Sequence, residues 1–295
     1  MGVRRGAFGV GVFGDCDFSR GGVFVSLGRE DEGRHFPLLE AAASLAQDEY
    51  PELDVQQVLG DVDQLLARLK RRLPADAAPL QRLRLLNQFF FHDLSFGGNV
   101  NDYYDPDNSY LNAVLRTRRG IPISLAVLWM ELAHGLGLQA RGVGFPGHFM
   151  LKVTLPKGQV VIDPFTGRSL SREELSERLE PYKRSNGLVG DFDVPLGLYL
   201  QPATPRDIIS RMLRNLKEVH RTQEDWQRAI AVQDRLITLL PDAWGEHRDR
   251  GLAHAEQGNT AQAVRDLETY LRNVEDALDI DAVAERVAAL RRAES

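Results

Sequence analysis

The chain has 295 residues, enough for one large domain or two ordinary ones with a core that needs no disulfide or metal. Its 43% hydrophobic and 26% charged residues exclude a largely disordered or fibrous protein, and a net charge of −6 argues against a dedicated nucleic-acid binder. The single cysteine, Cys16, can form neither an internal disulfide nor a cysteine-rich zinc site, so we expect a cytoplasmic protein without metal or cofactor.

Residues 1–34 are unusually rich in glycine and show no helical or strand period. We interpret them as a flexible leader or as the product of an over-extended start codon. The leader contains a GxGxxG match at Gly9–Gly14, but no solid strand precedes it and no helix pattern follows, so it does not indicate a dinucleotide site. Residues 121–138, the longest apolar stretch, include Pro122 and Glu131 and indicate a buried helix, so we expect no membrane span.

Apolar residues recur at helical spacing through the first part of the chain. This period predicts helices over residues 36–50, 54–73, 79–92 and 109–118, with turns at 97–99 and 105–108. The turn residues Asp102, Asp105, Asp107 and Asn108 invite a calcium interpretation. An EF-hand from Asp105 would need glycine at 110 and glutamate at 116, where tyrosine and arginine stand, so a structural turn is favoured.

A mixed segment follows. Pro122 suits the first position of the apolar helix, which we expect to end near Gly135 or Gly137. Strands are predicted over 140–145, 148–155 and 159–162, the last two joined by a hairpin turn at 156–158. Ser171 and Glu174 form a capping box that opens another helix, and an irregular connector is expected from about 182 to 205.

Residues 205–295 repeat with a period of 34 and resemble tetratricopeptide repeats. Gly251 stands at the position of tight helix packing, Gly258 in the turn and Ala263 at the helix crossing, and a closing helix is expected over 282–292. Small arrays of helix pairs more often bind proteins than perform chemistry, so we expect a protein or peptide partner, no nucleic acid and no membrane. The oligomeric state stays open.

The chemistry that the sequence suggests lies between residues 119 and 165. Folding back the predicted hairpin brings His148 close to Asp163, and a carboxylate beside an imidazole fixes its tautomer and raises its basicity. The start of the apolar helix would present partial positive charge to this pair. This is the layout of a Cys-His-Asp hydrolase or acyltransferase whose nucleophile lies on the first turn of the helix.

Three segments carry a family resemblance: NDYYDPDNSYLNAVLRTRRGIPISLAVLW, GLQARGVGFPGHFML and VVIDPFTG. They resemble the core of the transglutaminase-like superfamily, and specifically the bacterial SirB-one family, over about residues 36–292. The resemblance implies an α+β fold: a papain/transglutaminase-like core of helices plus a small antiparallel sheet, followed by an all-α tetratricopeptide module. We therefore predict a leader at 1–34, a core at 35–204 and helical repeats at 205–295.

The chain departs from the active superfamily at the nucleophile. Active members of the superfamily share a pattern of Gly, Cys, Ala, Ala-Arg, His and Asp-Pro. This chain matches every position of that pattern except the cysteine, where Pro122 stands. The matching residues are Gly120, Ala126, Ala140, Arg141, His148, Asp163 and Pro164. The resemblance thus implies a protein without thiol chemistry, a pseudoenzyme acting in protein or peptide binding or in regulation. The alternative is a hydrolase or acyltransferase with Ser124 as nucleophile, His148 as base and Asp163 as the group that orients it. Ser124 is two residues from the cysteine position and also fits a first-turn serine that satisfies helix backbone donors.

Overall fold

Helix α5 (Pro122–Gly135) lies at the centre of the computed structural model, which describes residues 36–188, 190 and 193–294. The predicted leader, with Cys16 and the GxGxxG match, lies outside the described residues. Nearly every side chain of α5 is buried, as a helix that is apolar on all sides requires. Pro122 is its first helical residue, where a missing N–H costs nothing.

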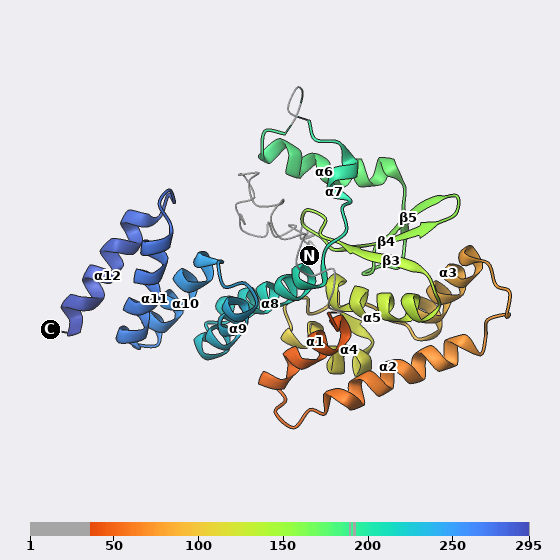
Figure 1. Ribbon diagram of the computed structural model, residues 1–295, viewed down its shortest axis with the longest axis horizontal. Coiled ribbons are helices and arrows are strands. Elements are labelled where there is room, and N and C mark those ends of the chain that lie inside the picture. Colours follow the sequence, from red (N-terminus) through yellow and green to blue (C-terminus); the bar gives the residue numbers. More distant parts are fainter. Residues whose placement is uncertain (1–35, 189, 191–192, 295) are drawn as a thin grey trace, which may run out of the picture.

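The elements around α5 come mostly from the first third of the chain. They pack around it in one hydrophobic cluster and resemble a small helical bundle (Figure 1). Their bounds are α1 (Leu38–Ser44), the 3-10 helix η1 (Leu45–Asp48), α2 (Val55–Lys70), α3 (Pro79–Asn87), the π-helix η2 (Gln88–Asp93), β1 (Gly97–Gly98), the 3-10 helix η3 (Pro106–Asn108), α4 (Leu111–Thr117) and β2 (Arg119–Gly120).

A four-stranded antiparallel sheet covers another side of α5, in the order β3-β4-β5-β6. The strands are β3 (Gln139–Val143), β4 (Met150–Leu155), β5 (Gly158–Ile162) and β6 (Ser169–Leu170). Alternate side chains enter different clusters: Leu151 faces the one around α5, whereas Met150 joins a smaller one with α6 (Arg172–Ser185). The sheet is therefore a middle layer between α5 and α6, with the single turn α7 (Leu196–Tyr199) beside α6 (Figure 1).

The last five helices of the described residues extend from the core as an arm, with the C-terminus at its far end (Figure 1). They are α8 (Pro205–Thr222), α9 (Trp226–Leu239), α10 (Trp244–Glu256), α11 (Thr260–Asn273) and α12 (Ile280–Glu294). A Cβ added at Gly251 would meet Leu267 at 2.9 Å, and Ala263 is fully buried. These contacts confirm the small-residue positions that the repeat pattern predicts, as does the positive φ of Gly258 in the turn.

Helix α8 packs against the core as well as against the repeats. Five of its side chains belong to the cluster around α5: Ile208, Ile209, Met212, Leu213 and Leu216. The hydrophobic cluster thus runs across the boundary predicted at residue 205 and continues into α9. Within the described ranges, no helix combines the length and apolar composition needed to cross a membrane.

The predicted architecture, an α+β core followed by helical repeats, is confirmed, and several boundaries differ. The helix predicted over 79–92 divides into α3 and η2, whose wider turn carries Phe89 and Phe90 into the core. Residues 97–98, predicted as a turn, pair in parallel with residues 119–120 as β1 and β2. Helix α6 continues past Pro181, so the irregular connector begins later than predicted. The strand predicted from His148 begins two residues further on, so His148 lies in the preceding loop.

Candidate functional site

His148 lies in the loop between β3 and β4, and its imidazole reaches the loop that follows β5. Its Nε2 is 2.8 Å from Oδ1 of Asp163, so the hairpin brings the two residues together as its register predicts. In the neutral imidazole this bond places the proton on Nε2 and leaves Nδ1 as an acceptor. Among the described residues Nδ1 has no hydrogen-bond partner, and 24% of the side chain is exposed.

The carboxylate of Asp163 is buried and accepts from several donors. Oδ1 also accepts from the backbone N–H of Phe165 at 2.9 Å, and Oδ2 accepts from Nη1 of Arg178 on α6 at 3.3 Å. Burial alone would raise the pKa of Asp163, but the hydrogen bond and charge of His148, the Phe165 amide and the Arg178 guanidinium outweigh it and hold the pKa at about 2. Asp163 is therefore ionised at neutral pH and orients the imidazole.

The first turn of α5 holds the two residues that bear on the question of a nucleophile. Pro122 is buried at the first position and carries no reactive atom. Ser124 is fully buried; its Oγ donates to Asn108 O at 2.6 Å, lies 3.1 Å from Ile121 O and accepts from Ile121 N at 3.2 Å. The Ser124 hydroxyl thus ties the start of α5 to η3, and His148 is not among its partners.

Asn108 joins the acidic turn to the start of α5. Its side chain donates to Asp102 O at 2.7 Å and accepts from the Asn99 amide at 3.0 Å, while its carbonyl receives the Ser124 hydroxyl. Asp107 accepts from the Tyr50 hydroxyl at 2.5 Å. The acidic turn is therefore a structural element, and no three His, Cys, Asp or Glu side chains of the described residues gather closely enough to hold a metal ion.

Aromatic side chains border the site. The rings of Tyr103 and Phe165 lie 6.1 Å apart, and Tyr104 packs edge-on against Tyr103 at 5.5 Å. Tyr104 is 53% exposed and its loop neighbour Val100 is 77% exposed. The loop over 99–105 therefore presents apolar surface next to the loop that carries Asp163.

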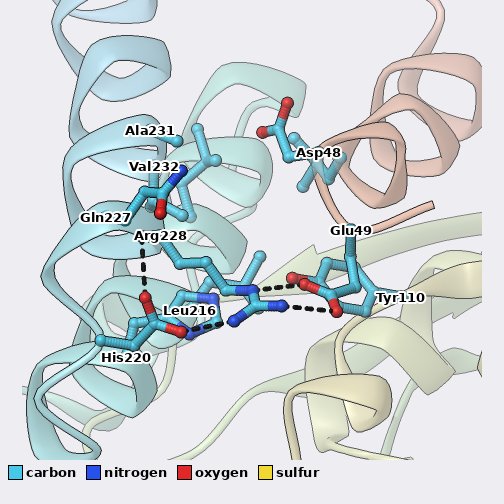
Figure 2. A pocket seen from close by; sticks show the side chains of 12 residues that line it. Asp48, Glu49, Tyr110, Leu216, His220, Gln227, Arg228, Ala231 and Val232 are labelled. Atoms are coloured by element: carbon cyan, nitrogen blue, oxygen red, sulfur yellow. Dashed lines mark hydrogen bonds and ion pairs between the residues drawn. The ribbon is translucent and has the colours of Figure 1, made fainter. Parts of the chain in front are cut away.

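The described residues form a hollow between the core and the first arm helices and another near the start of α12, and neither lining includes His148 or Asp163. One, of about 250 Å³, lies between η1, α8 and α9 (Figure 2). Arg228 lines it and forms ion pairs with Glu49 of the core and with Asp225 at the start of α9. His220 lines this hollow with an unpaired, buried Nδ1, and burial lowers the pKa of His220. The second hollow lies around residues 275–281, at the start of α12.

Sequence reasoning missed the groups that reach the site from distant segments. Arg178 bonds Asp163, and Arg211 on α8 bonds the backbone of the His148 loop. No spacing pattern marks either arginine, because both come from helices that follow the motif-bearing strands. The only available signal was the capping box at Ser171, which fixes where α6 begins.

Comparison with known proteins supports a transglutaminase-like core followed by tetratricopeptide repeats. Residues 56–214 match a family model described as the transglutaminase-like superfamily, and residues 216–288 match a tetratricopeptide repeat model. The UPF0162 protein of Xylella fastidiosa strain Temecula1 is 39% identical over 248 residues, which cover 84% of this chain and 87% of the relative. The UPF0162 protein of Pseudomonas aeruginosa is 30% identical, covering 86% and 90% of the two chains. The UPF0162 protein YchA of Escherichia coli K12 is 26% identical, covering 79% and 84%. No solved structure matches the chain.

Proposed function

We propose that the chain, which belongs to the UPF0162 family and has a transglutaminase-like core followed by tetratricopeptide repeats, binds a protein or peptide segment and performs no thiol chemistry. Two observations together carry this proposal: His148 and Asp163 form an ordered pair, and the central helix α5 begins with Pro122. The pair retains the hydrogen bond that would orient a base, while the position of the superfamily's cysteine holds a residue with no nucleophilic atom.

The exposed apolar side chains around the pair suit an extended peptide. His148 is partly exposed, and Val100 and Tyr104 offer apolar contacts on the neighbouring loop. We expect a peptide to lie along the surface, where it would contact this loop and the exposed part of His148. Tetratricopeptide arrays commonly mediate contacts between proteins, which supports the same class of partner.

The alternative function is hydrolysis or acyl transfer with Ser124, His148 and Asp163. One observation favours it: the unbonded Nδ1 of His148 is an acceptor of the kind that a general base needs. The Ser124 hydroxyl would first have to leave the Asn108 carbonyl, which is 2.6 Å away in a buried setting. That cost leads us to rank the alternative second.

Peptide selection tests the binding proposal directly. A displayed library of random peptides is selected against the full chain, and the enriched peptides are measured against the wild type, His148→Ala and His92→Ala. His92 is an exposed histidine on η2 and serves as the matched control. We expect His148→Ala to weaken binding about tenfold or more and His92→Ala to leave it unchanged. Equal affinity for all three proteins would overturn the proposal.

A second arm distinguishes binding from catalysis. The full chain is treated with a serine-directed acyl probe and with ester and amide substrates. We expect no labelling of Ser124 and no turnover beyond that of buffer. Labelling or turnover that disappears in Ser124→Ala would instead establish the alternative.

Narrower assignments remain part of this proposal. The three quoted motifs support membership of the SirB-one family within the broader superfamily. The single cysteine supports a cytoplasmic location, and the acidic net charge supports a partner other than nucleic acid. The change in sequence texture at residues 35 and 205 supports the proposed division into leader, core and repeats.

A further inference from the structure

The loop that carries His148 is a short connection between two strands. It runs from residue 144 to 149 and turns at Gly147, whose φ of +68° is one that glycine adopts readily. Phe145 and Phe149 are buried at its two ends, and Phe145 O accepts from His148 N at 3.0 Å. The loop is thus anchored at its ends, and the His148 carbonyl still requires a donor.

That donor comes from α8, the first helix of the arm. Nη2 of Arg211, on α8, donates to His148 O at 2.9 Å and lies 3.5 Å from Phe145 O. The guanidinium carbon also lies 5.6 Å from the centre of the Phe149 ring. A single guanidinium therefore contacts the backbone before His148, the backbone of His148 itself and the ring that follows.

We propose that Arg211 is a positioning residue for His148. The imidazole reaches Asp163 only from a fixed backbone, because its Nε2 lies 2.8 Å from a carboxylate that is itself held in place by Phe165 N and Arg178. A charged donor on the His148 carbonyl makes a stronger hydrogen bond than a neutral one and keeps the loop in register with the carboxylate. The value of this position for ligand binding rests on the proposed function, whereas the positioning itself does not.

Arg211 lies on a helix that links the core to the rest of the arm. Helix α8 contributes five apolar side chains to the cluster around α5 and packs on α9, so it contacts both the core and the other arm helices. The arrangement of the His148 loop consequently depends on α8, a helix that runs from the residues matched to the transglutaminase-like model into those matched to the repeat model. A core without α8 would retain His148 and Asp163 in sequence but lose the group that holds one of them.

Nuclear magnetic resonance of the full chain labelled with ¹⁵N-histidine tests the assignment. The Nε2–H signal of His148 is identified by its loss in His148→Gln, and its exchange with water is measured in Arg211→Met, Arg211→Lys and Arg214→Met. Methionine keeps the apolar contact with Phe149 and removes the donor. Arg214 lies on the same helix but pairs with Glu246, so its variant controls for general loosening of α8.

We expect Nε2–H exchange about tenfold faster or more in Arg211→Met, an intermediate rate in Arg211→Lys, and the wild-type rate in Arg214→Met. A wild-type rate in folded Arg211→Met overturns the proposal. If Arg211→Met does not fold, Arg211→Lys decides: a wild-type rate there overturns it. Faster exchange with unchanged peptide affinity would support the positioning role and count against His148 as a binding residue, so the two proposals fail separately.

Discussion

Replacing Ser124 with alanine should lower the free energy of unfolding by about 1 kcal/mol and leave the pairing of His148 with Asp163 intact. The reason lies in the partners that remain. Asn108 O, which loses the Ser124 hydroxyl, still accepts from Ile121 N at 3.2 Å. Ile121 O still accepts from the helical N–H of Leu125 at 3.1 Å.

The hydrogen-bond partners that remain decide how much free energy of unfolding the variant loses. Because the hydroxyl is fully buried, a variant that left an orphaned backbone group would lose about 1–3 kcal/mol. Ser124→Ala leaves each of these backbone groups with another partner, so the loss should be that of one net hydrogen bond, about 0.5–1.5 kcal/mol. Removing one oxygen adds little cavity volume.

A double-mutant cycle with Gly120 measures the contact between this glycine and the Ser124 hydroxyl. A Cβ added at Gly120 would meet Ser124 Oγ at 2.7 Å, Val114 at 3.1 Å and Asn108 O at 3.3 Å. Gly120→Ala should therefore be less destabilising in the Ser124→Ala background, with a coupling energy of about 0.5 kcal/mol or more. Urea unfolding followed by the fluorescence of Trp129, which is buried in α5, measures the cycle once the other two tryptophans are replaced.

Two results would refute this reasoning. A loss above about 3 kcal/mol in Ser124→Ala would mean that a buried carbonyl is left without a donor. Strictly additive effects of the two substitutions would mean that Gly120 and the hydroxyl are not in contact.

Three further predictions concern other parts of the molecule. The pKa of Asp163 is held at about 2, below its ordinary 3.8, so ionised Asp163 stabilises the fold above pH 3.8 by about 2 kcal/mol. This contribution is lost as the pH falls from 3.8 to 2. Urea unfolding measured across this range should therefore show a free energy of unfolding that depends less on pH in Asp163→Asn than in the wild type. A chain ending before α8 should aggregate and bind a hydrophobic dye, whereas one ending after α9 should stay monodisperse on size exclusion, because α8 covers the cluster around α5. Gly251→Ala should destabilise the repeats by about 1–3 kcal/mol, because its Cβ would lie 2.9 Å from Leu267. Gly245→Ala on the same helix should not, because a Cβ there meets nothing within 4 Å. Calorimetry compares the two variants, and equal melting temperatures would contradict the packing described.

The parts of the fold that follow a local pattern could be predicted from the sequence. The hairpin turn at 156–158 fixes the register of β4 and β5, and the register alone brings His148 and Asp163 to the same end of the sheet. The 34-residue period likewise fixes the contact between Gly251 and α11. Each of these depends on spacing along a single segment.

The parts that depend on contacts between distant segments could not be predicted. Ser124 bonds a carbonyl 16 residues earlier, and Arg211 bonds one 63 residues earlier, with no period linking either pair. The pairing of β1 with β2 joins two glycine-containing dipeptides that carry no strand pattern of their own. Tertiary packing decided these contacts, so the sequence identified the imidazole and the carboxylate but not the groups that hold them.

The shared helix α8 also limits how the gene for such a protein can change in length. Because α8 and α9 are joined to the core by buried side chains and by ion pairs such as Arg228 with Glu49, an inserted or deleted helix pair there would uncover the core. Units beyond α9 contact mainly their immediate neighbours, so duplication or loss of a unit there would alter only the length of the arm. Divergence in arm length among relatives should therefore accumulate toward the C-terminal end, and artificial grafts of extra repeats should be tolerated only there.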